Sequence, residues 1–326
     1  MIRTLIALSL SIASAVAVHA ADLTELTFGI IATESTQNLK KDWEVVRVDM
    51  EAKVGLPVKL FFAPDYSGVI EAMRFNKVQA GWFGNKSAID VIDRASGEVF
   101  AQVIDADGNP GYWSLIVVHK DSAITTLTEL LAKGKDLTFV MGDPQSTSGN
   151  LVPGYFAFAK NGVDPQKLFK GFRNGNHESN ALAVANKQAD AGTFNTEAMF
   201  QLERKHPEAA ANLKIIWKSG LIASDPIMYR TDLADGLKTK MKEFFLSYGS
   251  TSEQKAKLAP LKMSGFRASN NSQILPYRHL GALKAKAKLD ADTTMAADTK
   301  AAKIAELDKT IADLEAQLAA LPKPVN

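Results

Sequence analysis

Short apolar runs alternate with amphipathic segments along most of the chain. The runs at 26–32, 57–62 and 99–104 have the length of strands, and segments with a helical spacing of apolar residues separate them. The same alternation continues through apolar runs at 137–141 and 213–217. Strands that alternate with helices predict βαβ units, in which a largely parallel sheet is covered by helices on both faces.

Two consecutive series of such units predict two α/β lobes. The strand expected at 225–230 would return to the first lobe, so the chain would cross between the lobes twice and form a hinge near 116–120 and 220–226. The expected bounds are 21–117 together with 223–295 for the first lobe and 118–222 for the second.

A hydroxyl-rich turn follows the apolar run at 137–141. It reads Gly-Asp-Pro-Gln-Ser-Thr-Ser-Gly from Gly142 to Gly149, and a helical segment comes after it. The backbone amides of a helix N-terminus could hold a tetrahedral oxyanion there, together with the hydroxyls of Ser146, Thr147 and Ser148. An ordinary Ser/Thr helix cap is the alternative. A nucleotide P-loop is not favoured, because the Gly-Lys-Ser/Thr ending is missing.

The C-terminal segment at 296–326 carries a heptad pattern. Its apolar residues recur at alternating spacings of three and four: Ile304, Leu307, Ile311, Leu314, Leu318 and Leu321. Such a stripe favours paired helices and predicts a homodimer. The stripe covers only about two and a half heptads, so a terminal helix that packs on its own domain is the alternative.

Residues 1–20 have the pattern of a signal peptide. Arg3 precedes an apolar run that ends at Val18-His19-Ala20, so we expect cleavage after about Ala20 and export to the periplasm. The chain contains no cysteine, which excludes a disulfide, a thiolate metal site and a lipoprotein anchor. No later apolar run approaches the roughly 18 residues of a membrane span.

Composition and charge fit a two-domain protein with no nucleic-acid partner. Of 326 residues, 46% are hydrophobic, and 38 Lys and Arg against 36 Asp and Glu give a net charge of +2. No basic block is interleaved with aromatic residues. We also expect no metal and no cofactor.

Five further polar residues fall at loop ends that would face the cleft between the lobes: Tyr66, Tyr112, His177, Glu197 and Asp225. The loops at one edge of each sheet would meet there. Each residue has an ordinary alternative, as a turn aromatic, a surface histidine or an acid favoured at a helix start or turn.

Six sequence runs closely resemble the phosphonate-binding periplasmic proteins of ABC importers. They are Phe62–Tyr66, Gly111–Trp113, Gly142–Gly149, Leu151–Tyr155, His177–Lys187 and Asp225–Ile227. The similarity covers essentially the whole mature chain. It implies the fold of a type II periplasmic binding protein, whose two α/β lobes close on a ligand. It also implies a membrane permease and its ATPase as partners.

The resemblance further implies a role for each candidate residue. Phosphonate oxygens would be held by Tyr66, Ser146, Thr147, Ser148 and His177, and an amino group by Tyr112, Glu197 and Asp225. Two carboxylates are costly to bury unless a cation lies between them. The acid pair therefore favours 2-aminoethylphosphonate as the ligand. A bound dianion would raise the pKa of His177 above about 6.5, and binding would weaken in alkali.

Two other functions are open. The chain could bind another small oxyanion, such as phosphate, phosphite or methylphosphonate, although the acid pair would then lack a cation. It could also hydrolyse a phosphoester or phosphonate, with Ser146 and His177 as nucleophile and base. No Gly-x-Ser-x-Gly elbow and no histidine and aspartate cluster with metal-ligand spacing supports an enzyme. We expect a binding protein.

Overall fold

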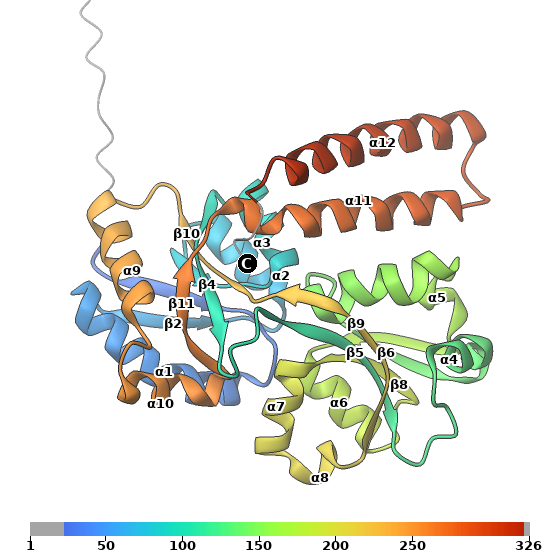
Figure 1. Cartoon of the computed structure of the whole chain (residues 1–326), viewed down its shortest axis with the longest axis horizontal. Helices are drawn as coiled ribbons and strands as arrows, with labels where there is room; N and C mark the ends of the chain where they lie inside the picture. The colour runs from blue at the N-terminus through green and yellow to red at the C-terminus, as the bar shows by residue number, and fades with distance from the viewer. Residues whose placement is uncertain (1–22, 323–326) are drawn as a thin grey trace, which may run out of the picture.

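Two mixed β-sheets form the centres of two α/β lobes in the computed structural model, which describes residues 23–322 (Figure 1). The predicted signal peptide lies outside the described residues. The first sheet has the strand order β11-β4-β10-β3-β1-β2, and the second has the order β7-β6-β8-β5-β9. Within residues 23–322, no helix is long and apolar enough to cross a membrane.

The first lobe is built from two separate parts of the chain. Its strands are β1 (Leu26–Ile30), β2 (Val58–Phe62), β3 (Ala80–Trp82), β4 (Gly97–Asp105), β10 (Pro226–Arg230) and β11 (Met263–Ala268). Its helices are α1 (Thr36–Val54), α2 (Tyr66–Arg74), α3 (Asn85–Arg94), α9 (Asp235–Ser247) and α10 (Ser252–Leu258), with short 3-10 turns at Ala259–Leu261 and Asn271–Ile274. Its core contains an aromatic cluster in which Phe28 lies against both Trp43 and Phe245.

The second lobe is one continuous part of the chain. Its strands are β5 (Gly111–His119), β6 (Thr138–Gly142), β7 (Gly171–Gly175), β8 (Ala191–Asn195) and β9 (Leu213–Ala223). Its helices are α4 (Leu127–Lys133), α5 (Pro165–Leu168), α6 (His177–Ala185), α7 (Thr196–Lys205) and α8 (Pro207–Ala210), with 3-10 turns at Gly134–Asp136 and Ala159–Asn161 and the π-helical turns η2 (Thr147–Leu151) and η3 (Gly154–Phe158). Separate hydrophobic clusters around Phe194 and Phe139 complete its core.

The sheets contain more antiparallel pairing than the sequence pattern predicts. β1 is parallel to β2 and β3, and β6 is parallel to β7 and β8. The strands next to the lobe crossings run the other way, since β10 is antiparallel to β3 and β4, and β5 is antiparallel to β8 and β9. Hydrophobic periodicity identifies a strand without giving its direction, so this feature could not be inferred from the pattern.

The first crossing between the lobes comes earlier than predicted. β5 pairs with β8 and β9 of the second sheet, so the expected boundary between residues 117 and 118 would cut through a second-lobe strand. The first connection instead occupies residues 106–110, and Ser224 and Asp225 form the return connection between β9 and β10. Tyr112 therefore lies in the second lobe, just after the crossing.

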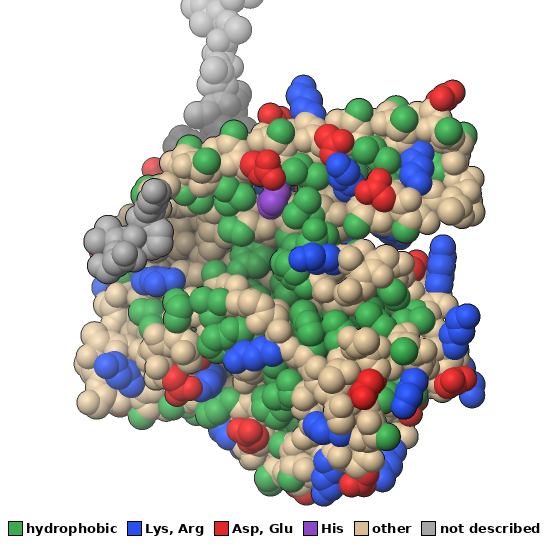
Figure 2. Space-filling view, turned by 45° about the vertical axis from the view of Figure 1, so that its right-hand side comes forward, with side chains coloured by type: hydrophobic (Ala, Val, Ile, Leu, Met, Phe, Trp, Pro, Cys, Tyr) green, Lys and Arg blue, Asp and Glu red, His purple; other side chains and the backbone are tan. Residues whose placement is uncertain are grey.

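The heptad stripe packs within the chain. Helix α11 (Leu275–Asp290) and helix α12 (Ala297–Ala319) form an antiparallel hairpin above the lobes (Figure 1). Ile311 and Leu314 are buried, and the other four stripe residues are partly buried. Figure 2 shows charged side chains along the outer face of the hairpin and hydrophobic side chains gathered where it meets the lobes. The stripe therefore has the self-packed arrangement that was the alternative to a dimer.

The packing of α12 predicts unequal effects of two substitutions on the same helix. Leu314→Ala removes a buried side chain and should lower the free energy of unfolding by about 2 kcal/mol. Lys309→Ala on the exposed face is the control and should change it by less than about 0.5 kcal/mol. Denaturant titration followed by circular dichroism measures both, and equal effects would contradict the packing described here.

Candidate functional site

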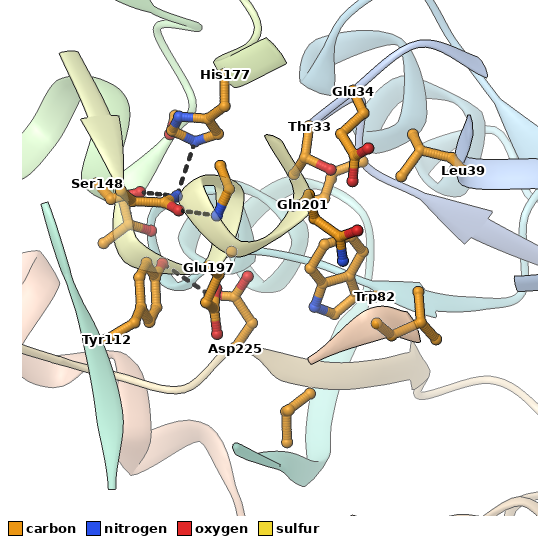
Figure 3. A pocket seen from close by; sticks show the side chains of 18 of the residues that line it. Thr33, Glu34, Leu39, Trp82, Tyr112, Ser148, His177, Glu197, Gln201 and Asp225 are labelled. Carbon is orange, nitrogen blue, oxygen red and sulfur yellow. Dashed lines mark hydrogen bonds between the residues drawn. The ribbon is translucent and has the colours of Figure 1, made fainter. Parts of the chain in front are cut away.

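A cleft between the lobes is lined by all eight site residues that were predicted from the sequence. Tyr66 begins α2, His177 begins α6, Glu197 lies in the first turn of α7, and Asp225 is on the return connection. The serine-rich turn contributes Ser146, Thr147 and Ser148. In Figure 3, His177 and Ser148 lie at one end of the cleft, Trp82 and Gln201 lie toward the other, and Glu197 and Asp225 lie between them. The structure thus brings the candidates together, while their contact with a ligand stays a prediction.

The serine-rich turn is a π-helical turn that packs tightly on its own strand. A Cβ atom on Gly142 would lie 2.5 Å from the Cα atom of Gly149, so the close approach of these two backbones requires glycine. Thr193 Oγ1 accepts a hydrogen bond from Gly142 N at 2.8 Å and donates one to Gly149 O at 2.7 Å. One threonine hydroxyl on β8 therefore joins both ends of the turn.

Each hydroxyl of the turn accepts a hydrogen bond from a protein N–H group. Ser146 Oγ accepts from Gly149 N at 2.9 Å, and Thr147 Oγ1 accepts from Lys86 N at 2.8 Å. Ser148 Oγ accepts from the side-chain amide of Asn195 at 2.9 Å. A hydroxyl that already accepts from nitrogen still has its own O–H to donate. Ser146 Oγ also lies 3.4 Å from His177 Nε2 and can donate to it. All three hydroxyls can act as donors, which suits an anion.

The surroundings of His177 favour its neutral form. The side-chain oxygen of Asn195 caps α7 by accepting from Ala198 N at 2.6 Å, which directs its NH₂ group toward His177 Nε2, 3.2 Å away. Nε2 then acts as the acceptor, so the ring proton is on Nδ1, which is buried and has no partner. Burial lowers the pKa of His177 to about 4. The expected rise in this pKa is thus absent without a ligand, because desolvation of the imidazolium dominates.

The two acids lie in surroundings that favour their neutral forms. Burial raises the pKa of Asp225 to about 7, against a hydrogen bond from Tyr112 Oη at 3.1 Å that lowers it. Burial also raises the pKa of Glu197 well above its usual value, and the negative charge of Asp225 raises it further. A cation placed between these carboxyl groups would reverse both shifts, because it stabilises the ionised forms.

Several residues of the cleft were missed by the sequence analysis. Asn195 and Gly84 each precede a helix at the end of a strand, which is the same strand-to-helix signal that identified the serine turn. Trp82 lines the cleft with its indole Nε1 buried and without a hydrogen-bond partner. No local pattern marks Trp82, because it reads as an ordinary core residue of β3.

Polar contacts join the lobes on both sides of the cleft. Lys86 N of α3 reaches Thr147, and Tyr66 N of α2 donates to Asp143 Oδ2 at 3.3 Å. On the outer side, Glu178 of α6 accepts hydrogen bonds from Ser35 N and the Asn38 side chain, each at 2.6 Å. The lobes are therefore closed on each other.

Two α/β lobes joined by two crossings, with a polar cleft between them, define the architecture of a type II periplasmic binding protein. The family model of the periplasmic substrate-binding protein of phosphonate ABC transporters matches residues 28–274. The chain belongs to this family, whose members bind substrates and are not enzymes, so the hydrolase alternative is wrong. Within residues 23–322, no group of three or more histidine or acidic residues could hold a metal ion.

Relatives agree with this assignment over nearly the whole chain. The phosphonates-binding periplasmic protein of Escherichia coli is 51% identical over 290 residues, which cover 89% of this chain and 86% of the relative. The crystal structure of a binding-protein component of an ABC phosphonate transporter from Pseudomonas aeruginosa has 52% identity and a TM-score of 0.89, covering 91% of this chain and 99% of that chain. A Prochlorococcus marinus protein in complex with methylphosphonate has 23% identity and a TM-score of 0.70, covering 82% of this chain and 99% of that chain, which shows the shared fold alone.

The double role of Thr193 gives a testable prediction about the turn. Thr193→Val keeps the side-chain shape but leaves Gly142 N and Gly149 O without their shared buried partner, so the free energy of unfolding should fall by about 1–3 kcal/mol. Denaturant titration measures the loss. Thr294→Val at an exposed position is the control, and an equally small effect at both positions would contradict the structural role of Thr193.

Proposed function

We propose that the chain binds 2-aminoethylphosphonate, or a closely related aminoalkylphosphonate, between its lobes. The observation that carries the proposal is that donor hydroxyls and carboxyl groups occupy different parts of the cleft. Three hydroxyls that can donate lie at one end, and the carboxyl groups of Glu197 and Asp225 line the same cleft. A ligand with an anionic and a cationic group would satisfy both ends.

The anion end suits a phosphonate. Hydroxyl groups of Ser146, Thr147 and Ser148, together with the backbone amides at the start of the turn, would donate to its oxygens. His177 would take up a proton, or reorient, to donate as well. Of the described residues that line the cleft, none is a lysine or arginine, so hydrogen bonds rather than a fixed counter-charge would hold the anion.

The acid end accounts for the choice of an amino compound. Glu197 and Asp225 would ionise around an ammonium group, and Tyr112 would keep one carboxylate oriented through its hydrogen bond. Phosphate, phosphite or methylphosphonate would leave the pair either protonated or repelling the ligand. The remaining oxyanion alternative is therefore less favourable than an aminoalkylphosphonate.

Export and transport partners follow from the family and the N-terminal sequence. We propose that the signal peptide is cleaved after about Ala20 and that the loaded protein delivers its ligand to a membrane permease and its ATPase. A homodimer through the heptad stripe stays a prediction: α12 buries Ile311 and Leu314 against its own chain, and the other four stripe residues are partly buried.

Calorimetric titration of the mature protein tests the ligand. 2-Aminoethylphosphonate should bind at micromolar or tighter affinity, and methylphosphonate and phosphate should bind more weakly by about 2 kcal/mol or more, because they leave the acids unpaired. Glu197→Gln should remove most of this difference. Glu203→Gln, at an exposed position on the same helix, is the matched control. Equal affinity of the wild type for all three compounds would contradict the ammonium site.

The raised pKa of Asp225 predicts a pH dependence of binding. An ammonium lowers this pKa from its value of about 7 in the empty site, so affinity is present above pH 7 and is lost as the pH falls below it. From pH 8 to 5.5, the affinity for 2-aminoethylphosphonate should fall relative to methylphosphonate, by up to about tenfold per pH unit for each proton. Methylphosphonate corrects for ionisation of the phosphonate itself. The relative fall should be smaller in Asp225→Asn, and parallel profiles for the two ligands in the wild type would contradict the assignment.

A further inference from the structure

Three consecutive carbonyl groups of the π-helical turn η2, those of Ser148, Gly149 and Asn150, accept hydrogen bonds from residues that do not line the cleft. Ser114 Oγ donates to Ser148 O at 2.6 Å, and Thr193 Oγ1 donates to Gly149 O at 2.7 Å. The third carbonyl, of Asn150, accepts from Lys284 Nζ at 3.3 Å. Gly149 N donates back to Ser146 Oγ at 2.9 Å, and Leu151 N donates to Ser146 O at 3.0 Å. The contacts to the carbonyls therefore fix the shape of the turn that carries the three hydroxyls.

Lys284 differs from the other two donors because it carries a charge and comes from the C-terminal hairpin. Its Nζ also contacts Asn150 Oδ1 at 3.0 Å, and the amide nitrogen of the same side chain donates to Gly142 O at 3.2 Å. The lysine packs over Gly154, where a Cβ atom would lie 2.3 Å from Nζ. The backbone is thus shaped to admit the lysine against the rear of the turn.

Helix α11 carries Lys284 from the first lobe to the second. At its start, Arg278 pairs with Asp93 of α3, with Nη1 2.7 Å from Oδ2. Tyr277 Oη accepts from Ala223 N at 2.7 Å, next to the return connection. Figure 1 shows α11 passing from the side of α3 to a position above the second lobe. Tyr277 and Leu280 of α11 also pack with Leu151 and Val152 of the second lobe. The hairpin therefore contacts both lobes, and Lys284 is a polar contact between it and Asn150.

Burying the ammonium group of Lys284 costs desolvation free energy. Burial, together with the nearby charges of Lys86 on α3 and Lys288 on α11, lowers the pKa of Lys284 to about 8, against Asp164, just before α5, which raises it. A methionine of similar length would fill the same space without the desolvation cost. The charge lies behind the serine-rich turn, where it would favour a bound anion, and this gives a reason for its presence.

We propose that Lys284 is a positioning residue for the phosphonate site. It fixes the Asn150 carbonyl at the end of the turn and places a positive charge behind an anion site that has no lysine or arginine among the described residues lining it. Because α11 contacts both lobes, the same contact links ligand affinity to the C-terminal hairpin. This inference rests on the proposed binding of a phosphonate at the serine turn.

Titration of Lys284→Met and Lys288→Met with 2-aminoethylphosphonate and methylphosphonate at pH 7.5 tests the proposal. Lys284→Met should weaken both ligands by about tenfold, since both share the anion end and a charged hydrogen bond is lost. Lys288→Met removes an exposed charge from the same helix and should leave both affinities unchanged. The midpoint of thermal unfolding should be equal or higher in Lys284→Met, because the buried charge is gone. A merely structural lysine would lower stability and affinity together.

A pH profile supplies a second readout. A bound dianion raises the pKa of Lys284, so its contribution to affinity is present below pH 8 and is lost as the pH rises through the value in the complex. Between pH 7.5 and 9.5, wild-type affinity for methylphosphonate should fall more steeply than that of Lys284→Met.

The possible outcomes separate this inference from the proposed function. If the wild type binds neither phosphonate, the proposed function fails. If the wild type binds and Lys284→Met matches Lys288→Met in affinity and pH profile, the role of Lys284 is overturned. Should Lys284→Met fail to fold, Lys284→Gln and Lys288→Gln give the same comparison. The role of Lys284 is again overturned if Lys284→Gln has the affinity and the pH profile of the wild type.

Discussion

The hydrogen bonds that hold the serine-rich turn are the constraint on which the binding site depends. Its hydroxyls accept from nitrogen donors in the turn itself, in α3 and in the Asn195 side chain. Their O–H groups can donate to a ligand, that of Ser146 by leaving His177 Nε2, 3.4 Å away. Its carbonyls are held on the other side by Ser114, Thr193 and Lys284. A turn supported in this way presents donors with little rearrangement, and preorganised donors lose less free energy to ordering when an anion binds.

Burial favours the neutral forms of both the basic and the acidic side chains in the cleft. At the anion end, burial favours the neutral form of His177, and no lysine or arginine of the described chain lines the cleft. Between this end and Trp82 and Gln201, burial favours the protonated forms of Glu197 and Asp225 until a cation arrives. The empty site thus avoids isolated buried charges, and a zwitterionic ligand would supply the charges in compensating pairs.

Contacts between the lobes bring residues from both lobes to the cleft. Thr147 Oγ1 accepts a hydrogen bond from Lys86 N of the first lobe. Tyr66 N of the first lobe donates to Asp143 Oδ2 of the second. Separation of the lobes would break both contacts, and ligand contacts to both lobes would favour the closed form. The hairpin of α11 and α12 adds a further connection between the lobes, away from the cleft entrance.

The sequence by itself determined the two α/β lobes, the turn at Gly142–Gly149 and the helix-start positions of Tyr66, His177 and Glu197. These features depend on local periodicity, capping and turn chemistry, which short segments encode. Only the tertiary structure decided that β5 belongs to the second sheet, that the surroundings of His177 favour its neutral form, and that α12 packs on its own chain. It also placed Asn195, Trp82 and Lys284 around the site. Strand partners, burial and contacts between distant segments arise from packing of the whole chain, so no local pattern could have shown them.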